Sequence, residues 1–162
     1  MTMKRFALII AAAVLSLSAI AQDGKSIYNK YSNEEGVSAV YISPAMFRLI
    51  GKIPEIKTEE NGVDLSPIIR SLTGMYIIST SNPKVRGKIH DEASRFVKSK
   101  KYELLMEAKD NGEAMNMYTI GNDKIINGFV FLAQDGEETS FICFDGNIDR
   151  KQFEDTVSSL TK

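Results

Sequence analysis

Four short strand-like runs, separated by turn-forming residues, occupy most of the second half of the chain and restrict the folds that it can adopt. From residue 102 onward the hydrophobic period becomes two, which is the period of a β-strand with one buried face. The runs cover residues 102–108, 114–120, 124–132 and 139–145. The turn signals between them are Asp110-Asn111-Gly112, Gly121-Asn122-Asp123 and Asp135-Gly136. Close spacing with such turns is typical of an antiparallel meander.

The first half of the chain supplies helices and two further strands. Residues 27–35 predict a short helix, and residues 37–42 and 74–80 predict strands. Ser43-Pro44 and Ser66-Pro67 are helix starts, because serine caps free amides and proline suits the first helical turn.

Two longer helices follow from the spacing of apolar residues. Asn82-Pro83 opens an amphipathic helix, and the order strand, helix, strand around it suggests a right-handed crossover that joins parallel neighbours. Asp149 and Gln152 have the spacing of a capping box and open a final helix. We therefore predict an α+β domain with a mixed, mostly antiparallel sheet of about five or six strands and helices mainly on one face.

The first residues have the pattern of a secretory signal peptide. Lys4-Arg5 precedes an apolar stretch over residues 6–20, and Ala19-Ile20-Ala21 puts small residues at the positions that a signal peptidase reads. The apolar stretch is shorter than the roughly 20 residues that a membrane-spanning helix needs. We expect residues 1–21 to be removed after Ala21. Residues 22–162 then form a single periplasmic or extracellular domain without a membrane span.

Charge and composition exclude several classes of protein. With 20 basic and 21 acidic residues the net charge is −1, so the broad basic surface of a nucleic-acid-binding protein is absent. A single Cys and a single His cannot form a disulfide within one chain or a zinc site built from several such residues. Cys143 lies in an apolar run and is interpreted as a buried hydrophobic residue.

Three segments carry a resemblance to a known family. They are Val40-Tyr41-Ile42-Ser43-Pro44-Ala45-Met46-Phe47, Tyr102-Glu103-Leu104-Leu105-Met106 and Phe144-Asp145-Gly146-Asn147-Ile148-Asp149. Together with the meander they resemble the exported Bacteroidota envelope family catalogued as domain of unknown function 4252 (DUF4252). The resemblance implies an exported α+β domain and brings no activity, cofactor or catalytic residue. It also implies lipoproteins among the relatives, but this chain lacks the lipobox cysteine.

The candidate catalytic residues do not converge in the sequence. His90 lies on the amphipathic helix, where neighbouring side chains point about 100° apart, so a solvated or core-flanking histidine is favoured over a general base. A hydrolase would draw on carboxylates such as Glu34, Glu35 and Glu137, although adjacent carboxylates are more often solvated charges. We predict no catalytic, cofactor-binding or metal-binding residue.

The strand at residues 124–132 is apolar on both sides, which a sheet with helices on one face does not require. One interpretation is a central strand covered on both sides by the chain itself. The other is a partly exposed face that binds a partner, a ligand or a second copy of the chain. In simple alternation Ile125, Phe129 and Phe131 share a side with Asn127, and Asn is usually exposed, so these three form the candidate interaction face.

The function expected from the sequence is that of a non-enzymatic binding or interaction module in the cell envelope. Its expected partner is an unknown envelope protein or ligand, and not a nucleic acid. The alternatives are a carboxylate-based hydrolase and a structural or stress-response protein. Self-association into a homo-oligomer is compatible with each of them.

Overall fold

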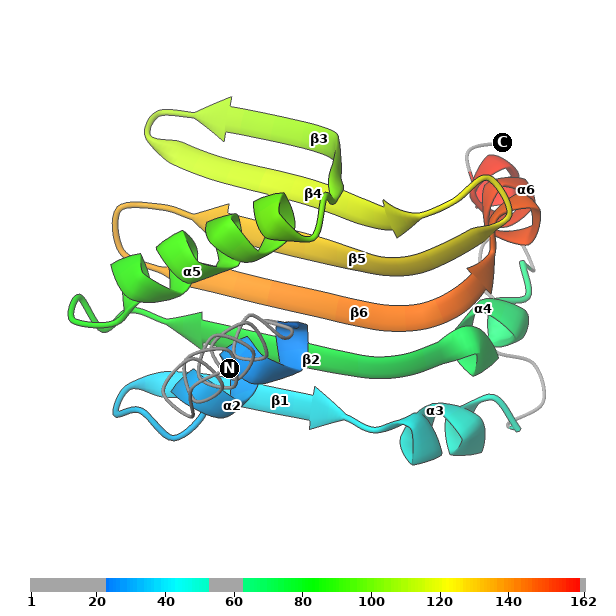
Figure 1. Ribbon diagram of the computed structural model, residues 1–162, viewed down its shortest axis with the longest axis horizontal. Coiled ribbons are helices and arrows are strands. Elements are labelled where there is room, and N and C mark those ends of the chain that lie inside the picture. Colours follow the sequence, from blue (N-terminus) through cyan, green and yellow to red (C-terminus); the bar gives the residue numbers. More distant parts are fainter. Residues whose placement is uncertain (1–22, 53–62, 161–162) are drawn as a thin grey trace, which may run out of the picture.

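The computed structural model describes residues 23–52 and 63–160, so the predicted signal peptide lies outside the described residues. Six strands form one sheet in the order β1-β2-β6-β5-β4-β3, and each pair of neighbours is antiparallel (Figure 1). The strands are β1 (Val37–Ile42), β2 (Leu72–Thr80), β3 (Glu103–Asp110), β4 (Glu113–Gly121), β5 (Ile125–Gln134) and β6 (Thr139–Asp149). The helices are α2 (Gly24–Tyr31), α3 (Pro44–Ile50), α4 (Ser66–Ser71), α5 (Arg86–Ser99) and α6 (Arg150–Leu160).

The predicted α+β class and the antiparallel meander are confirmed. Strands β3 to β6 follow one another across the sheet, and each pairs with the next. The β3–β4 turn uses Asn111 and Gly112, whose φ angles are 45° and 91°. A tight two-residue hairpin turn requires such positive values, which is why Asn-Gly is a strong hairpin signal.

The predicted crossover between parallel neighbours is wrong. Helix α5 leads from β2 to β3, but β6, β5 and β4 lie between these two strands. The last strand of the meander, β6, pairs with β2 from Leu72 opposite Gly146 to Thr80 opposite Thr139. The meander therefore folds back toward the first strands and leaves β3 at the far edge of the sheet.

Polar side chains cap α2, α3 and α6. Ser43 accepts a hydrogen bond from the Met46 amide at 3.3 Å, and Asp149 caps α6 in the same way. Helix α2 begins earlier than predicted because Asp23 and Ser26 form a capping box, in which the Ser26 amide donates to Asp23 Oδ1 at 2.7 Å.

The predicted cap by Ser66 is wrong, because Ser66 is the first residue of α4 and the N-cap residue is Leu65, which makes no side-chain hydrogen bond. Helix α5 likewise has no side-chain cap, and it begins at Arg86, three residues after the predicted Asn82-Pro83 start.

Helices α2 and α5 lie on one face of the sheet, which we call the covered face (Figure 1). Their apolar side chains pack on those of the strands beneath them and form the main core. Its buried members are Ile27, Tyr31, Tyr76, Ile78, Ile89, Ala93, Phe96, Val97, Val130, Leu132, Phe141 and Cys143. Because α5 contributes four of these residues, the apolar face predicted for this helix is confirmed.

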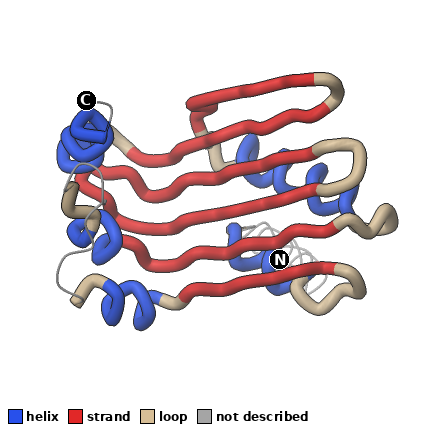
Figure 2. Tube along the Cα trace, turned by 180° about the vertical axis from the view of Figure 1, so that it is seen from behind, coloured by secondary structure: helices blue, strands red, loops and turns tan. Residues whose placement is uncertain are grey.

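The opposite face of the sheet is covered at one end. Helices α3, α4 and α6 gather there (Figures 1 and 2). A second cluster forms around Ile126, Phe129 and Ile148, with Ile68 of α4 and Phe153 of α6 packed against it. Among the described residues, no helix crosses the middle of the strands on this side (Figure 2).

Gly24, the first residue of α2, lies against the buried thiol of Cys143. A Cβ atom on Gly24 would stand 2.4 Å from Sγ and 2.7 Å from Cβ of Cys143, which is closer than non-bonded atoms approach. Cys143 is fully buried and cannot move aside without disturbing the core. Gly87 in α5 is the opposite case, since a Cβ atom there meets nothing within 4 Å.

We expect Gly24→Ala to lower the free energy of unfolding by about 1–3 kcal/mol, because the methyl group overpacks the core. Gly87→Ala should raise it by up to about 1 kcal/mol, because alanine restricts the unfolded chain and favours the helix. Equilibrium unfolding in urea measures both changes. In a double variant, Cys143→Ala should remove part of the penalty of Gly24→Ala, because it removes the contact with Sγ and leaves the contact with Cβ, and strictly additive effects would contradict the proposed contact.

Candidate functional site

One apolar residue from each strand lines up across the uncovered part of the sheet. In the strand register these residues stand directly opposite one another, so their side chains share one face. From the β1 edge to the β3 edge they are Val40, Ile77, Ile142, Phe131, Met117 and Met106. We call this set the apolar row.

Solvent reaches the apolar row along its length. Val40 at one edge is 45% exposed, Met106 at the other is 42% exposed, and the four residues between them are half-buried. An antiparallel sheet with one solvated face typically carries polar side chains there. With six strands about 4.8 Å apart, the row is an apolar stripe about 24 Å long.

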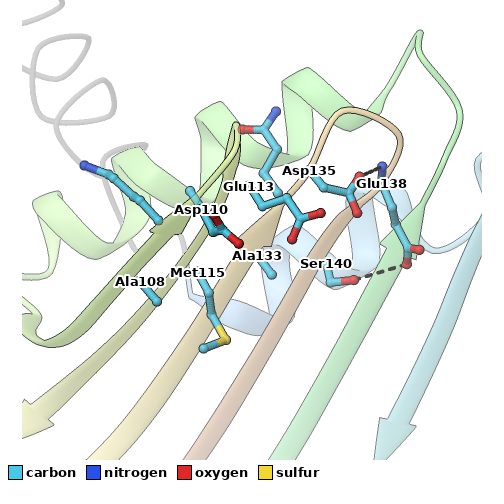
Figure 3. Close-up of a pocket in the computed structure, with 11 residues that line it drawn as sticks. Ala108, Asp110, Glu113, Met115, Ala133, Asp135, Glu138 and Ser140 are labelled. Atoms are coloured by element: carbon cyan, nitrogen blue, oxygen red, sulfur yellow. Dashed lines mark hydrogen bonds between the residues drawn. The ribbon is translucent and has the colours of Figure 1, made fainter.

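Beside the apolar row, small side chains leave a hollow of ≈ 450 Å³ (Figure 3). Ala108, Met115, Ala133 and Ser140 line it and stand opposite one another on β3, β4, β5 and β6. Because three of these four side chains are small, the surface dips between Met115 and the turns of the two hairpins. The apolar row and this hollow together make up what we call the open face.

The hairpin turns at the end of the hollow carry a group of exposed carboxylates (Figure 3). We call this group the acidic rim, and it consists of Asp110, Glu113, Asp135 and Glu138. Asp110 and Glu113 stand directly opposite each other in the β3–β4 register, which is an unfavourable arrangement for two like charges. Lys109 lines the same hollow, but its Nζ is 2.9 Å from Oε1 of Glu107.

The β5–β6 turn fixes its part of the acidic rim. Oδ1 of Asp135 accepts hydrogen bonds from the amides of Glu138 and Glu137, both at 2.6 Å. These bonds hold the pKa of Asp135 below its ordinary value, so this carboxylate is ionised at neutral pH. Ser140 Oγ donates to Oε1 of Glu138 at 3.2 Å. The rim is therefore an ordered cluster of negative charge.

An irregularity in β3 decides which of its apolar side chains reaches the open face. The register shifts between Leu104 and Met106. Leu104 pairs with Tyr118, which packs on the main core, whereas Met106 pairs with Met117. Because directly paired residues point to the same face, Leu104 and Met106 point to opposite faces although they are two positions apart.

The structure places the three residues of the predicted interaction face in different surroundings. Phe131 belongs to the apolar row. Phe129 is only 7% exposed, because Phe153 of α6 lies against it with ring centroids 5.3 Å apart. Ile125 lies at the start of β5, opposite Asp149. The hypothesis of an interaction face now rests on Phe131 and its neighbours in the apolar row.

A second irregularity explains this separation. The register between β5 and β6 shifts between Ile126 and Gly128, so simple alternation fails at this point. Ile126 consequently packs with Phe129 in the second cluster, and not with Val130 in the main core.

The other five members of the apolar row were not predicted from the sequence, because cross-strand neighbours follow from strand order and register. The signal within each strand was the alternation of its own apolar residues.

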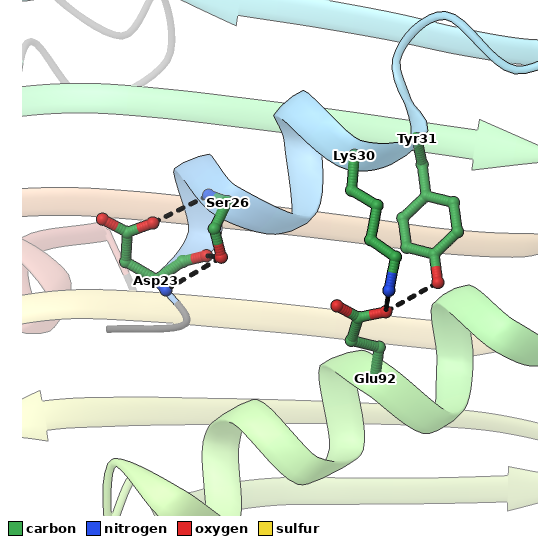
Figure 4. A network of polar contacts seen from close by, with 5 residues as sticks. All are labelled: Asp23, Ser26, Lys30, Tyr31 and Glu92. Carbon is green, nitrogen blue, oxygen red and sulfur yellow. Dashed lines mark hydrogen bonds and ion pairs between the residues drawn. The ribbon is translucent and has the colours of Figure 1, made fainter. Parts of the chain in front are cut away.

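A polar cluster joins α2 to α5 above the covered face (Figure 4). Glu92 of α5 is 4% exposed, and its Oε2 accepts hydrogen bonds from Lys30 Nζ and Tyr31 Oη, both at 2.6 Å. Burial by itself raises the pKa of Glu92, but the hydrogen bonds from Lys30 and Tyr31 outweigh it, and the pKa lies below its ordinary value. The Glu92 carboxylate is ionised and accepts hydrogen bonds from two donors of α2. We therefore interpret it as a structural tie, meaning a polar link between α2 and α5, and not as a proton-transfer group.

The residues considered for catalysis lie in three separate segments. His90 is on α5, with Nδ1 3.6 Å from Oδ1 of Asp91. Glu34-Glu35 follows α2, and Glu137 is in the β5–β6 turn. Cys143 on β6 is fully buried, and burial raises the pKa of its thiol, so its interpretation as a buried hydrophobic residue is confirmed.

Two further properties concern the described part of the chain. Within residues 23–52 and 63–160, no group of three or more His, Cys, Asp or Glu is arranged to hold a metal ion. None of the helices in these ranges has the length and hydrophobicity that crossing a bilayer requires.

Comparison with known sequences assigns the chain to a family. A sequence model of the family described as domain of unknown function (DUF4252) matches residues 31–156. This match covers well over half of the chain, from the end of α2 into α6, and the chain therefore belongs to this family. The resemblance predicted from the three segments is thus confirmed. No curated protein and no solved structure matches the chain.

The tie through Glu92 should make stability depend on pH. Because the pKa of Glu92 is lowered by folding, its contribution is present above the unfolded-state pKa of about 4.3 and is lost as the pH falls through the folded-state value. We expect Glu92→Gln to lower the free energy of unfolding at neutral pH by about 1–3 kcal/mol. The deficit relative to the unmodified protein should shrink as the pH is lowered from about 6 to about 3.

Urea unfolding at a series of pH values measures this dependence, and Asp91→Asn is the matched control. Asp91 is the preceding residue of α5, and its side chain is 71% exposed. Its substitution should change the unfolding free energy by less than about 0.5 kcal/mol at any pH. A deficit for Glu92→Gln that stays constant across the pH range would rule out an ionised tie.

Proposed function

We propose that this protein is an exported, non-enzymatic binding protein that acts through the open face. The observation that carries the proposal is the apolar row, which crosses all six strands without a polar interruption and without a covering helix among the described residues. Leaving apolar surface in water costs about 25 cal/mol for each Å². A continuous exposed apolar stripe is therefore a mark of an interaction surface.

The geometry of the open face suits a macromolecular partner. Its members come from every strand of one rigid sheet, so the surface is formed before any partner arrives, and binding needs little ordering of this side. The two edge residues Val40 and Met106 are the most exposed members of the row. A partner that spans the sheet removes both from water, together with the half-buried residues between them.

Export supports an envelope role for this surface. The proposal takes residues 1–21 as a signal peptide on the evidence of their charged start, apolar stretch and small residues before Gln22. The partner is then a component of the periplasm or of the extracellular space.

A pair of photo-cross-linking variants tests the use of the open face. A benzophenone amino acid at Met106 points from the open face, whereas the same group at Leu104 points from the covered side of the same strand. The two positions are similarly exposed, at 42% and 50%. We expect irradiation of cells that produce the protein to give a discrete cross-linked adduct from position 106 and much less from position 104.

Thermal melts of both variants should resemble that of the unmodified protein, because both side chains are exposed. Phe129→Asp serves as the contrasting substitution, since it buries a charge beneath α6 and should unfold the domain. Equal adducts at positions 104 and 106, or none at position 106, would contradict an interaction through the open face.

Processing is tested separately. Protein purified from its native host should begin at Gln22, and its intact mass should equal that of residues 22–162. A retained N-terminal segment, or an added lipid mass, would contradict the proposed export as a free protein.

A further inference from the structure

The acidic rim restricts what can occupy the open face. It places four exposed carboxylates at the end of the hollow, next to the apolar surface of Met115 and Ala133. Lys109, which lines the hollow, pairs with Glu107, and Arg86 donates to the carbonyl of Gly136 and attracts the Asp135 carboxylate. The hollow beside the apolar row is thus bounded at its far end by a cluster of negative charge.

The Asp110 and Glu113 pair is the most informative part of this cluster. These residues are directly opposite each other, and both side chains are exposed on the same face. Like charges in this position destabilise a hairpin. A cation brought by a partner relieves this repulsion. The pair of carboxylates therefore binds a positive charge more favourably than an isolated carboxylate does.

We propose that the occupant of the open face is an amphipathic protein segment, apolar along the row and carrying Lys or Arg side chains that contact the acidic rim. The inference rests on the proposed function and adds the chemistry of the partner. A helix of about 16 residues is about 24 Å long and matches the length of the apolar row. Its cationic side chains pair with the carboxylates of the two hairpin turns.

Charge complementarity favours this occupant over an anionic membrane and over one arrangement of a second copy. A second copy docked by its own open face, with the twofold axis along the strands, would bring one acidic rim near the other. With the axis along the apolar row the two rims lie apart, and light scattering tests that arrangement. A membrane surface rich in anionic lipid would be repelled by the rim. A protein segment with basic and apolar side chains can pair with the acidic rim and also cover the apolar row.

Two designed peptides of about 18 residues test the inference. Both are amphipathic helices with the same apolar face; one carries lysines along the side of that face that would lie next to the hollow, and the other carries glutamates at the same positions. Fluorescence anisotropy with the full mature chain measures the Kd of each. We expect the lysine peptide to bind at least about tenfold more tightly, and added NaCl to weaken its binding.

Variants of the protein locate the contact. Glu113→Lys should weaken binding of the lysine peptide about threefold to tenfold, while its melting temperature stays the same or rises because a like-charge pair is removed. Asp91→Lys makes the same charge change on α5, away from the open face, and should leave the Kd within about twofold. Met106→Ser should weaken binding of the peptide, and Leu104→Ser should not, because these residues point to opposite faces.

The outcomes separate this inference from the proposed function. Equal affinity for the two peptides, with Met106→Ser weakening both, would overturn the charge complementarity and leave a binding face of purely apolar character. No binding of either peptide, together with no adduct at position 106, would overturn both proposals. Dimerisation in light scattering that Met106→Ser abolishes, or binding to phosphatidylglycerol vesicles without binding of the lysine peptide, would also overturn the inference.

Discussion

The pairing of β6 with both β2 and β5 holds the fold together, because it joins the first two strands to the rest of the sheet. This central strand must present apolar residues on both faces. Phe141 and Cys143 lie in the main core beneath α2 and α5, whereas Phe144 packs against the second cluster near α4 and α6. Ile142 lies on the face opposite the main core, and together with Phe131 it forms the middle of the apolar row. The open face is therefore the part of a two-sided central sheet that the helices of this chain leave uncovered.

Local chemistry in the sequence was sufficient to predict the class of the fold. Asn111-Gly112 marks a hairpin because it tolerates positive φ, and Ser43 and Asp149 mark helix starts because their oxygens accept from free amides. The order of the strands was not predictable in the same way. Strand β3 is distant from β2 because β6 pairs with β2 across separations of 59 to 74 residues, and no local signal encodes such a contact.

The candidate site was predictable only in part, for the same reason. Phe131 was found because its own strand is apolar on both sides, whereas its five companions join it through the register of five different strands. The irregularities near Leu104 and Gly128 reverse the alternation that the sequence implies. The acidic rim was missed because Asp110 and Asp135 are ordinary turn residues when each turn is considered alone, and only the folded sheet brings the two turns to one hollow.

The burial of Cys143 has a practical consequence for work on this protein. Cys143 is the only cysteine in the sequence, and its thiol is enclosed beneath α2. The folded surface therefore presents no native thiol to a labelling reagent. A cysteine introduced at any exposed position becomes a unique attachment point for a spin label or a fluorophore. A label can then be placed on either face of the sheet to report on that face alone, and the native Cys143 need not be replaced.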